Sequence, residues 1–377
     1  MQAARYDALV IGIGGMGAAA LAHLARRGLR VTGIEQDDVP SERGSSVGET
    51  RVIRKAYAED PRYVPLLERA YVLWRELERA SGEPLFVRTG CLNMGPPDHP
   101  AIRGVGESVA IHGLPHEVLA ADAIRQRFPA LAPAPGDVGV FEHDAGYLHV
   151  EACTRAHARV ARSHGAELRT RTRVTELHLD GPEGVAVVLD DGTRLTAPRA
   201  VVAAGPWLAA SPQLREVARD LRLSVERQVQ LWFRRAPLDL PVFIHFLAEG
   251  AFYAIPTAES VKVCQHHGGE STTPDTLDRA LRPADEEAVR TYLRAHMPSA
   301  DGAPLRSRVC MYSNTPDQHF VVGRLPRAPH VVLLGGFSGH GYKMAPVIGE
   351  IAAQLTVDGS TPFDLGLFDP SRFVRSR

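Results

Sequence analysis

The glycine spacing near the N-terminus is typical of a dinucleotide-binding turn. Gly12, Gly14 and Gly17 follow an apolar run at residues 6–13 and precede a stretch with helical periodicity. The backbone amides of such a turn and the positive end of the helix dipole can hold a pyrophosphate at close approach. Glu35 follows the next apolar run and can accept hydrogen bonds from a ribose hydroxyl. The pattern predicts a cofactor with an ADP half, FAD or NAD, although a tight structural turn would use the same glycines.

Lysine is rare in this chain. Only Lys55, Lys262 and Lys343 occur among the 43 basic residues, and arginine fills the other positions. Because arginine is preferred in this chain, a lysine is expected at a position that needs a compact, mobile ammonium rather than a planar guanidinium. Chance is the alternative explanation, and only the motifs around the three lysines can separate the two.

Three longer segments carry a more specific signal. They are residues 44–54 (GSSVGETRVIR), 310–320 (CMYSNTPDQHF) and 335–346 (GGFSGHGYKMAP). Together they resemble the monomeric sarcosine oxidase and N-methyltryptophan oxidase family of FAD-dependent enzymes, and the similarity extends to the terminal FDPSRF segment. The resemblance implies that the cofactor is FAD.

The same resemblance implies a pair of cations that binds a carboxylate. Arg54 and Lys343 match the family positions that hold the carboxylate of the substrate. Two cations on one carboxylate would fix the α-nitrogen and its carbon over the flavin. A surface ion pair is the alternative for Arg54. Tyr253 and Tyr312 match positions that line the same pocket, although an isolated tyrosine can simply pack in a core.

Other residues match family positions close to the flavin ring. Lys262 resembles a lysine that promotes electron transfer to dioxygen, because a fixed charge in a dry site stabilises developing superoxide. Arg51 matches an arginine beside the ring. His266 matches a histidine that tunes the substrate amine, with a structural histidine as the alternative. The other residues expected at the cofactor, besides Lys343, are Gly12, Gly14, Gly15, Gly17, Glu35, Ser45, Thr50, Val174, Cys310, Gly339 and Gly341.

Cys310 is expected to carry the FAD covalently. In the family a cysteine at this position forms a thioether to the flavin ring, and a partly ionised thiol can attack an electrophilic methyl position. A buried structural thiol is the alternative for a lone cysteine. Val47 is a departure, because family members commonly have His before the Gly-x-Thr-Arg segment. The resemblance implies that a polar contact is lost there, with consequences for the flavin potential and its attachment.

This interpretation does not identify the side chain of the substrate. Residues 241–250 (PVFIHFLAEG) bring His245 and Phe246 to a segment where the resemblance implies a less polar pocket. An N-methyl, N-alkyl or cyclic secondary α-amino acid fits the family, with sarcosine as the first substrate to test.

The elements that must position these residues begin with a βαβ unit. A strand at residues 6–13 enters the glycine turn, a helix ends at Gly28, and a second strand at residues 29–34 ends at Glu35. A further helix is capped by Asp60 with Pro61 in its first turn.

Strands dominate the later chain. Residues 173–205 read as a β-meander that returns to the main sheet, and residues 330–334 read as a buried strand before a second glycine turn. Residues 221–265 alternate apolar and polar side chains, which predicts a separate sheet able to cover a ligand pocket.

These elements predict an α/β protein, a Rossmann-like FAD-binding domain with an inserted β-sheet-rich substrate domain. The FAD-binding domain is expected to comprise residues 1–85, 147–215 and 317–377. The substrate domain is expected to comprise residues 86–146 and 216–316.

Composition excludes several partners. The chain has 43 basic and 44 acidic residues, a net charge of -1 and no long run of one sign, so we expect no nucleic acid partner. The four cysteines lie far apart, which argues against a metal site or a disulfide scaffold and favours a reducing, cytoplasmic setting. The apolar stretch at residues 8–25 contains the glycine motif and reads as core rather than as a signal peptide. We expect no membrane span and a monomer.

We therefore expect an FAD-dependent oxidase that acts on a small secondary amino acid and dioxygen, yielding an imine and hydrogen peroxide. An FAD-dependent dehydrogenase that passes electrons to a carrier is one alternative, against which Lys262 argues. A flavin-binding subunit without turnover is another, but Arg54 and Lys343 would need an anionic ligand. A nicotinamide enzyme would have no use for Cys310.

Overall fold

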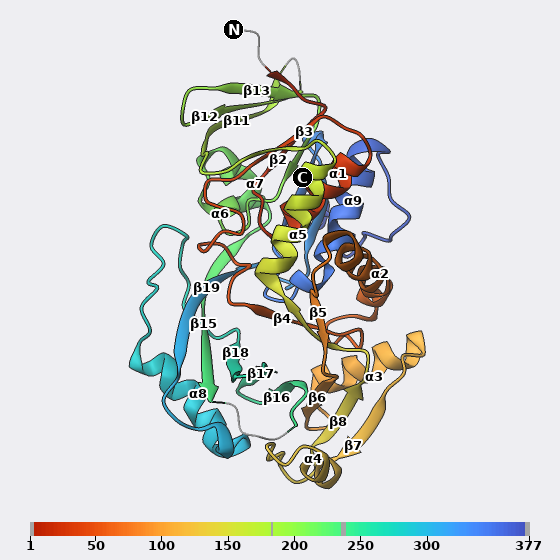
Figure 1. Ribbon diagram of the computed structural model, residues 1–377, viewed down its shortest axis with the longest axis vertical. Coiled ribbons are helices and arrows are strands. Elements are labelled where there is room, and N and C mark those ends of the chain that lie inside the picture. The colour runs from red at the N-terminus through yellow and green to blue at the C-terminus, as the bar shows by residue number, and fades with distance from the viewer. Residues whose placement is uncertain (1–3, 182–183, 235–238, 374–377) are drawn as a thin grey trace.

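The computed structural model of the protein describes residues 4–181, 184–234 and 239–373. The molecule is elongated, with a sheet and helix assembly at the end where both termini lie and a large antiparallel sheet at the other end (Figure 1). Within the described ranges, no helix has the length and apolar character needed to cross a membrane.

A six-stranded sheet forms the centre of the first assembly. Its order is β10-β3-β2-β14-β21-β20, and only the β20–β21 pair is antiparallel. The strands are β2 (Ala8–Ile11), β3 (Val31–Ile34), β10 (Glu167–Arg169), β14 (Ala200–Val202), β20 (Val321–Leu325) and β21 (Ala328–Gly335). The short buried runs of the sequence thus become parallel strands that are covered on both faces.

Helices α1, α5 and α9 pack together beside this sheet, and α2 packs against α5 and α9 (Figure 1). They are α1 (Gly15–Arg26), α2 (Val64–Ser81), α5 (Val150–Ser163) and α9 (Ala345–Val357). The carboxylate of Asp60 caps the 3₁₀ turn Pro61–Tyr63 that leads into α2, and Gly82 ends α2 in the left-handed conformation. The start of this helix agrees with the sequence prediction, and its end has the usual glycine cap.

The predicted meander divides between two sheets. Only β14 joins the six-stranded sheet, whereas β11 (Val174–Gly181), β12 (Gly184–Leu189) and β13 (Arg194–Ala197) pair with β1 (Ala4–Arg5) in a separate four-stranded sheet. The segment therefore returns to the main sheet through β14, as predicted, after β11 to β13 have formed a separate sheet. Their buried side chains share one core cluster with β2 and β21, so the two sheets pack against each other.

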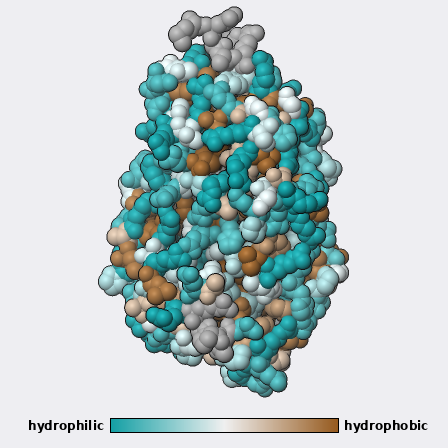
Figure 2. Space-filling model, in the orientation of Figure 1, coloured by the Kyte–Doolittle hydropathy of each residue, from teal (hydrophilic) through white to brown (hydrophobic). Residues whose placement is uncertain are grey.

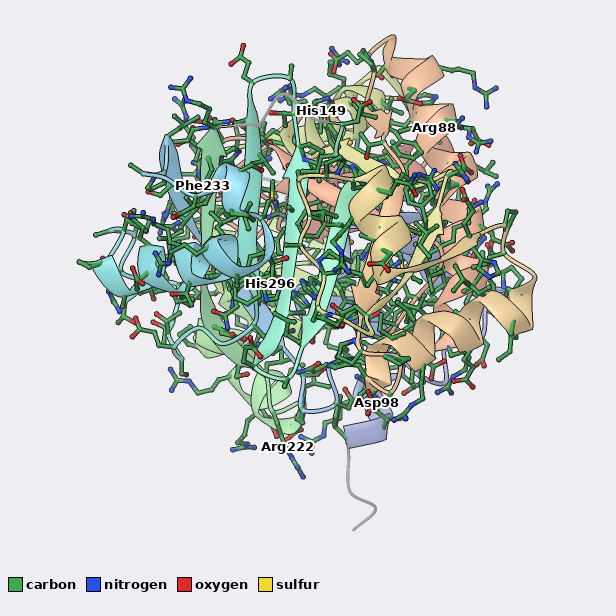
Figure 3. The ribbon with its side chains drawn as sticks, turned by 90° about the horizontal axis from the view of Figure 1, so that it is seen from below. Arg88, Asp98, His149, Arg222, Phe233 and His296 are labelled. Carbon is green, nitrogen blue, oxygen red and sulfur yellow. The ribbon has the colours of Figure 1, made fainter. Side chains whose placement is uncertain are left out.

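An eight-stranded sheet forms the opposite end, in the order β19-β15-β18-β17-β16-β6-β8-β7. Its strands are β6 (Cys91–Gly95), β7 (Glu117–Ala120), β8 (Val138–Glu142), β15 (Ser224–Arg234), β16 (Val242–Leu247), β17 (Gly250–Pro256), β18 (Ser260–His266) and β19 (Arg306–Asn314). Helix α8 (Pro283–His296) lies against one face, on the side from which Figure 3 views the molecule, with Phe233 and His296 labelled.

A three-stranded sheet, in the order β4-β9-β5, lies between the two assemblies (Figure 1). It contains β4 (Thr50–Ile53), β5 (Phe86–Arg88) and β9 (Gly146–His149). The remaining helices are α3 (Pro100–His112), α4 (Ala121–Arg127), α6 (Trp207–Ala210) and α7 (Arg215–Asp220). Further 3₁₀ turns are Pro212–Leu214, Pro298–Ala300, Tyr342–Met344 and Pro370–Phe373.

The arrangement has the predicted α/β class, while the exact division into two domains stays a prediction. On the face seen in Figure 2, hydrophilic residues predominate and apolar residues occur in small scattered groups.

Candidate functional site

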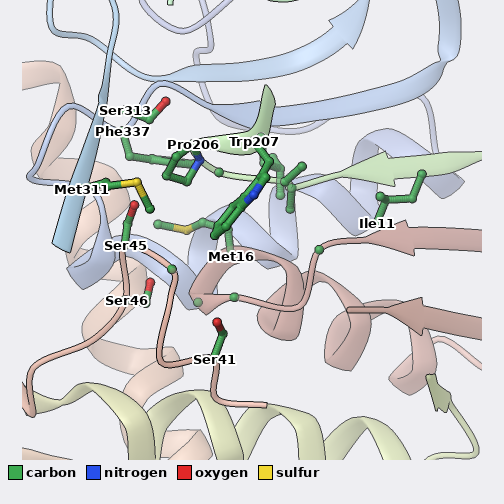
Figure 4. A pocket seen from close by; sticks show the side chains of 18 of the residues that line it. Ile11, Met16, Ser41, Ser45, Ser46, Pro206, Trp207, Met311, Ser313 and Phe337 are labelled. Carbon is green, nitrogen blue, oxygen red and sulfur yellow. The ribbon is translucent and has the colours of Figure 1, made fainter. Parts of the chain in front are cut away.

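A cavity opens at the carboxyl ends of β2 and β3, beside the glycine turn (Figure 4). Trp207 and Met16 form part of its wall, and Ser41 and Ser45 approach it from the loop that follows β3. The predicted cofactor residues that line it are Gly12, Gly14, Gly15, Glu35, Ser45, Arg51, Val174, Gly339 and Gly341, together with Tyr312. Segments far apart in the sequence therefore meet at one cavity.

The glycines of the turn have different structural roles. Gly12 has φ of +87°, and a Cβ atom there would lie 2.6 Å from the carbonyl oxygen of Ala203. A Cβ atom on Gly17 would lie 1.8 Å from the carbonyl oxygen of Gly12, so Gly17 lets α1 pack against the turn. Gly14 is the N-cap of α1, and the space beside it is open. The turn therefore leaves room for a ligand at the helix N-terminus.

Glu35 closes the turn from the end of β3. Its Oε2 accepts a hydrogen bond from the Ile13 amide at 2.7 Å, and its Oε1 accepts one from the Asp37 amide at 3.2 Å. Burial raises the pKa of this carboxyl, while the two amides oppose that rise. The side chain is fixed at the cavity wall, where the sequence predicts contact with a ribose.

Buried polar atoms in this cavity fit a dinucleotide. The hydroxyls of Ser45 and Ser313 have no hydrogen-bond partner among the described residues, although both side chains line the cavity. Buried hydroxyls without partners are costly, and a polar ligand would satisfy them. The open glycine turn, the fixed Glu35 and these hydroxyls therefore suit FAD.

One face of the eight-stranded sheet carries most of the predicted catalytic side chains. Cys310 lies opposite Gln228, and Lys262 lies opposite Trp232, in antiparallel registers without a bulge. Residues that lie opposite each other share a face, and side chains two apart point the same way. The predicted residues on this face are Tyr253, Lys262, His266, Cys310 and Tyr312.

Lys262 is fully buried and reaches from this face to β4. Its Nζ donates hydrogen bonds to the carbonyls of Gly48 and Thr50 at 2.9 and 2.6 Å. Burial, and then the nearby charge of Arg51, lowers the pKa of Lys262 to about 7. Arg51 in turn donates to the carbonyls of Ser45 and Thr50 at 2.8 and 2.9 Å. The two cations are held next to each other by backbone oxygens.

Arg54 and Lys343 form a second pair of buried cations. The Arg54 guanidinium and the Lys343 ammonium lie 4.9 and 5.1 Å from the centre of the Tyr57 ring. Lys343 Nζ donates to the carbonyl of His340 at 2.6 Å. Burial, followed by repulsion from Arg54, lowers the pKa of Lys343 to about 7. An anion bound here would relieve that repulsion.

Glu59 partly balances this charge, although no motif in the sequence indicates it. Its carboxylate lies 3.6 Å from Arg54 Nη2 and 3.8 Å from His340 Nδ1. Burial alone would raise its pKa, but His340, Arg54 and Lys343 outweigh burial and lower the pKa to about 2. Tyr57 and His340, also missed, share a hydrogen bond of 2.5 Å between the hydroxyl and Nδ1. The glycine turn at residues 335–341 was the only available hint for His340.

His266 and Tyr312 contact each other beside this cluster. His266 Nδ1 lies 3.2 Å from the Tyr312 hydroxyl, and burial lowers the pKa of His266 well below its usual value. A Cβ atom on Gly339 would lie 2.4 Å from the Tyr312 ring. The glycine therefore lets the second glycine turn approach the sheet.

Some predicted residues lie outside the lining of the cavity in the described part of the chain. Gly17 packs the helix against the turn, and Thr50 is buried in β4. Cys310 is 1% exposed and directly precedes the cavity residues Met311 and Tyr312. Lys343 follows the cavity residue Tyr342.

The expectation for His245 is wrong. This fully buried side chain points to the α8 face of the sheet, where Nδ1 lies 3.2 Å from the Tyr292 hydroxyl and Nε2 lies 3.5 Å from Asp137 Oδ2. Phe246 points the other way and stacks on His99, with ring centres 5.6 Å apart. The alternation of β16 separates two residues that the sequence placed in one pocket wall.

A family model described as FAD dependent oxidoreductase matches residues 7–355. The chain belongs to this family. Its relatives include a monomeric sarcosine oxidase of Streptomyces avermitilis, which is 40% identical with 98% of each chain covered. A monomeric sarcosine oxidase of a Bacillus species is 34% identical over 97% of this chain and 96% of the relative. An N-methyl-L-tryptophan oxidase of Salmonella arizonae is also 34% identical, over 98% of this chain and 99% of the relative.

Solved structures agree with this assignment. A point mutant of the amino acid oxidase NikD, in an open form, is 26% identical, with a TM-score of 0.86 and 97% of each chain covered. An L-proline dehydrogenase from P. horikoshii has the same fold at 24% identity, with a TM-score of 0.87 and 99% of each chain covered. The resemblance to the sarcosine and N-methyltryptophan oxidases is thus confirmed, and this member of the family is an FAD-dependent oxidase.

Proposed function

We propose that this oxidase removes two electrons from the C–N bond of a secondary α-amino acid, with an N-methyl, N-alkyl or cyclic nitrogen. The relatives named as sarcosine oxidases make sarcosine the first substrate to test. The observation that carries the proposal is the pair of buried cations, Arg54 and Lys343, which lie 4.9 and 5.1 Å from the centre of the Tyr57 ring. The reaction yields an imine, which water hydrolyses, and hydrogen peroxide.

Arg54 and Lys343 bind the substrate carboxylate in this proposal. Burial, and then repulsion from Arg54, lowers the pKa of Lys343, and an anionic ligand would stabilise both charges. A carboxylate held by two cations orients the α-carbon and the nitrogen, and this orientation lowers the entropic part of the barrier. Tyr253 and Tyr312 line the same space.

His266 faces the substrate amine as a neutral imidazole. Burial keeps its pKa well below the usual value, so it carries no charge that would repel an ammonium. With Tyr312 hydrogen-bonded to Nδ1, the other ring nitrogen is available to hold or release a proton.

Bound FAD supplies the two-electron acceptor of the reaction. The glycine turn and Glu35 would hold its ADP half, Ser45 and Val174 would line its site, and Arg51 would lie beside its ring. Lys262 would stabilise the charge that develops as dioxygen is reduced. Cys310 would form a thioether to the flavin ring.

A dehydrogenase that passes electrons to a carrier is the second candidate. The same fold occurs in a protein named as an L-proline dehydrogenase, so the fold does not separate the two. The buried charge of Lys262 favours the oxidase. We also propose a monomer in a reducing compartment, where Cys91, Cys153 and Cys264 remain thiols.

The experiment is a comparison of three alanine variants. We expect Arg54→Ala and Lys343→Ala each to weaken sarcosine binding by about 1.5–3 kcal/mol, the usual worth of a charge-assisted hydrogen bond. Lys55→Ala is the matched control, because Lys55 pairs with Asp144 at 3.3 Å away from this cluster. Rapid-mixing measurement of flavin reduction against sarcosine concentration gives the dissociation constants.

Wild-type affinity in both site variants would remove these residues from the substrate site. Formation of one hydrogen peroxide per sarcosine consumed supports the oxidase. Turnover only with an artificial electron acceptor would favour the dehydrogenase.

A further inference from the structure

The surroundings of Cys310 contain a polar side chain that no motif predicts. Gln230 lies on β15, is 2% exposed, and points to the same face of the sheet as Cys310. Its Nε2 lies 3.1 Å from Cys310 Sγ and 3.3 Å from the carbonyl oxygen of Val47. This amide therefore joins the thiol to the segment between β3 and β4.

The neighbouring backbone is shaped to admit this side chain. Gly48 has φ of +95°, and a Cβ atom there would lie 1.9 Å from Gln230 Oε1. Any larger residue at position 48 would collide with the amide. Lys262 binds the Gly48 carbonyl at 2.9 Å and so holds the next peptide of the same segment.

The amide is also incompletely satisfied. Gln230 Oε1 is buried and has no hydrogen-bond partner among the described residues. A buried glutamine with an unpartnered oxygen is costly in a strand that could carry an apolar residue. The contact with Cys310 explains why a polar residue occupies position 230.

We propose that Gln230 is a positioning residue that holds the Cys310 thiol for covalent attachment of the flavin. The proposal rests on the thioether linkage proposed above. It also bears on Val47, where the resemblance implies a histidine, because the Gln230 amide donates to the Val47 carbonyl and brings a polar group to this segment.

The chemistry needs such a donor. The Cys310 sulfur forms a bond to a ring methyl carbon, while the thiol proton and one methyl hydrogen leave. The two electrons released reduce the flavin ring, and dioxygen, the proposed co-substrate, takes them up to give hydrogen peroxide. An N–H donor stabilises the thiolate that attacks and fixes the direction of its lone pairs.

The test measures attachment rather than turnover. Full-length chain is produced in a host starved of riboflavin, FAD is added in air, and intact mass and in-gel flavin fluorescence follow the adduct with time. Gln230→Met keeps the length of the side chain and removes the donor. We expect attachment to slow by about ten- to a hundredfold, the usual effect of losing one hydrogen bond to a charged group.

Two further variants separate positioning from folding. Gln228→Met is the matched control, because Gln228 lies on the same strand and face but donates to Glu226 Oε1 at 2.7 Å. It should attach FAD at the wild-type rate. Val47→His in the Gln230→Met background should restore at least part of the rate, because the donor then comes from the facing segment.

Each outcome decides the proposal. If Gln230→Met attaches FAD at the wild-type rate, and the wild type itself forms the flavin adduct, the role of Gln230 is overturned while the proposed thioether linkage stands. Equal slowing by Gln228→Met also overturns it, because the effect would then be general to the strand. Absence of any adduct on wild type overturns the linkage itself, and this proposal with it.

Discussion

Burial gives both site lysines a pKa near neutrality, but their surroundings differ. Lys262 is held by two backbone carbonyls and lies near Arg51, whereas Lys343 lies near Arg54 and Glu59. The ammonium of Lys262 thus has hydrogen-bond acceptors already in place. The ammonium of Lys343 has the His340 carbonyl as an acceptor, and the proposed substrate carboxylate would be a second one.

We expect carboxylate binding to weaken as pH rises through about 7, because the lowered pKa of Lys343 makes it neutral above that pH. Below this pH both cations are charged, while Glu59 and His340, with pKa values lowered to about 2 and about 4, do not titrate in the same range. The limit is about tenfold in affinity per pH unit. Titration of the flavin spectrum with a small carboxylate that lacks an amine measures the effect, and Lys343→Met should flatten the profile.

Lys262→Met tests the role of the buried charge. Methionine keeps the length and apolar bulk of the stem, so a purely structural lysine would tolerate the change. We expect reoxidation of the reduced enzyme by dioxygen to slow by roughly two to three orders of magnitude. Reduction by substrate should change less, because Arg54 and Lys343 remain. Stopped-flow measurement of the two half-reactions checks this, and equal reoxidation rates would contradict the assigned role.

At the scale of the element, one face of the eight-stranded sheet carries side chains that stabilise the fold, and the other face carries side chains of the site. Phe233 and Val263 point to α8 and belong to a buried apolar cluster, whereas their neighbours Trp232 and Lys262 point to the site. Alternation along β15 and β18 produces this division.

We expect Phe233→Ala to lower the free energy of unfolding by about 3–5 kcal/mol, because a large buried ring leaves a cavity under α8. The FAD content of the folded protein should stay unchanged, since the ring faces away from the site. Val118→Ala on β7 of the same sheet is the control, because Val118 is 65% exposed and should change stability by less than about 0.5 kcal/mol. Denaturant unfolding measures both, and loss of FAD from folded Phe233→Ala would contradict the division of the faces.

Local sequence patterns predicted the helices, strands and turns better than they predicted which side chains of different elements contact each other. The glycine turn, the cap at Asp60 and the strands of residues 221–265 follow from spacing and alternation alone. Glu59 and Gln230 could not be found this way, because their importance comes from contacts with Arg54 and Cys310 across other elements. His245 was misplaced because composition does not reveal which face of β16 is covered by α8.

At the scale of the whole molecule, the cofactor cavity is a meeting point of distant segments. Its wall includes Gly12 after β2, Arg51 in β4, Trp207 at α6 and Tyr342 beyond β21. The six-stranded sheet likewise pairs β14 with strands from the two ends of the chain, β2 on one side and β21 on the other.

This interleaving sets an order of events during synthesis. When the first βαβ unit leaves the ribosome, it can form its glycine turn, but the strand that flanks β14 and the glycines at 339 and 341 are still untranslated. The nascent chain therefore cannot enclose the cofactor until β21 and these two glycines have been made. Capture of FAD therefore waits for the translation of this segment, and an mRNA truncated before the codons for β21 would encode a polypeptide that lacks part of the cavity wall.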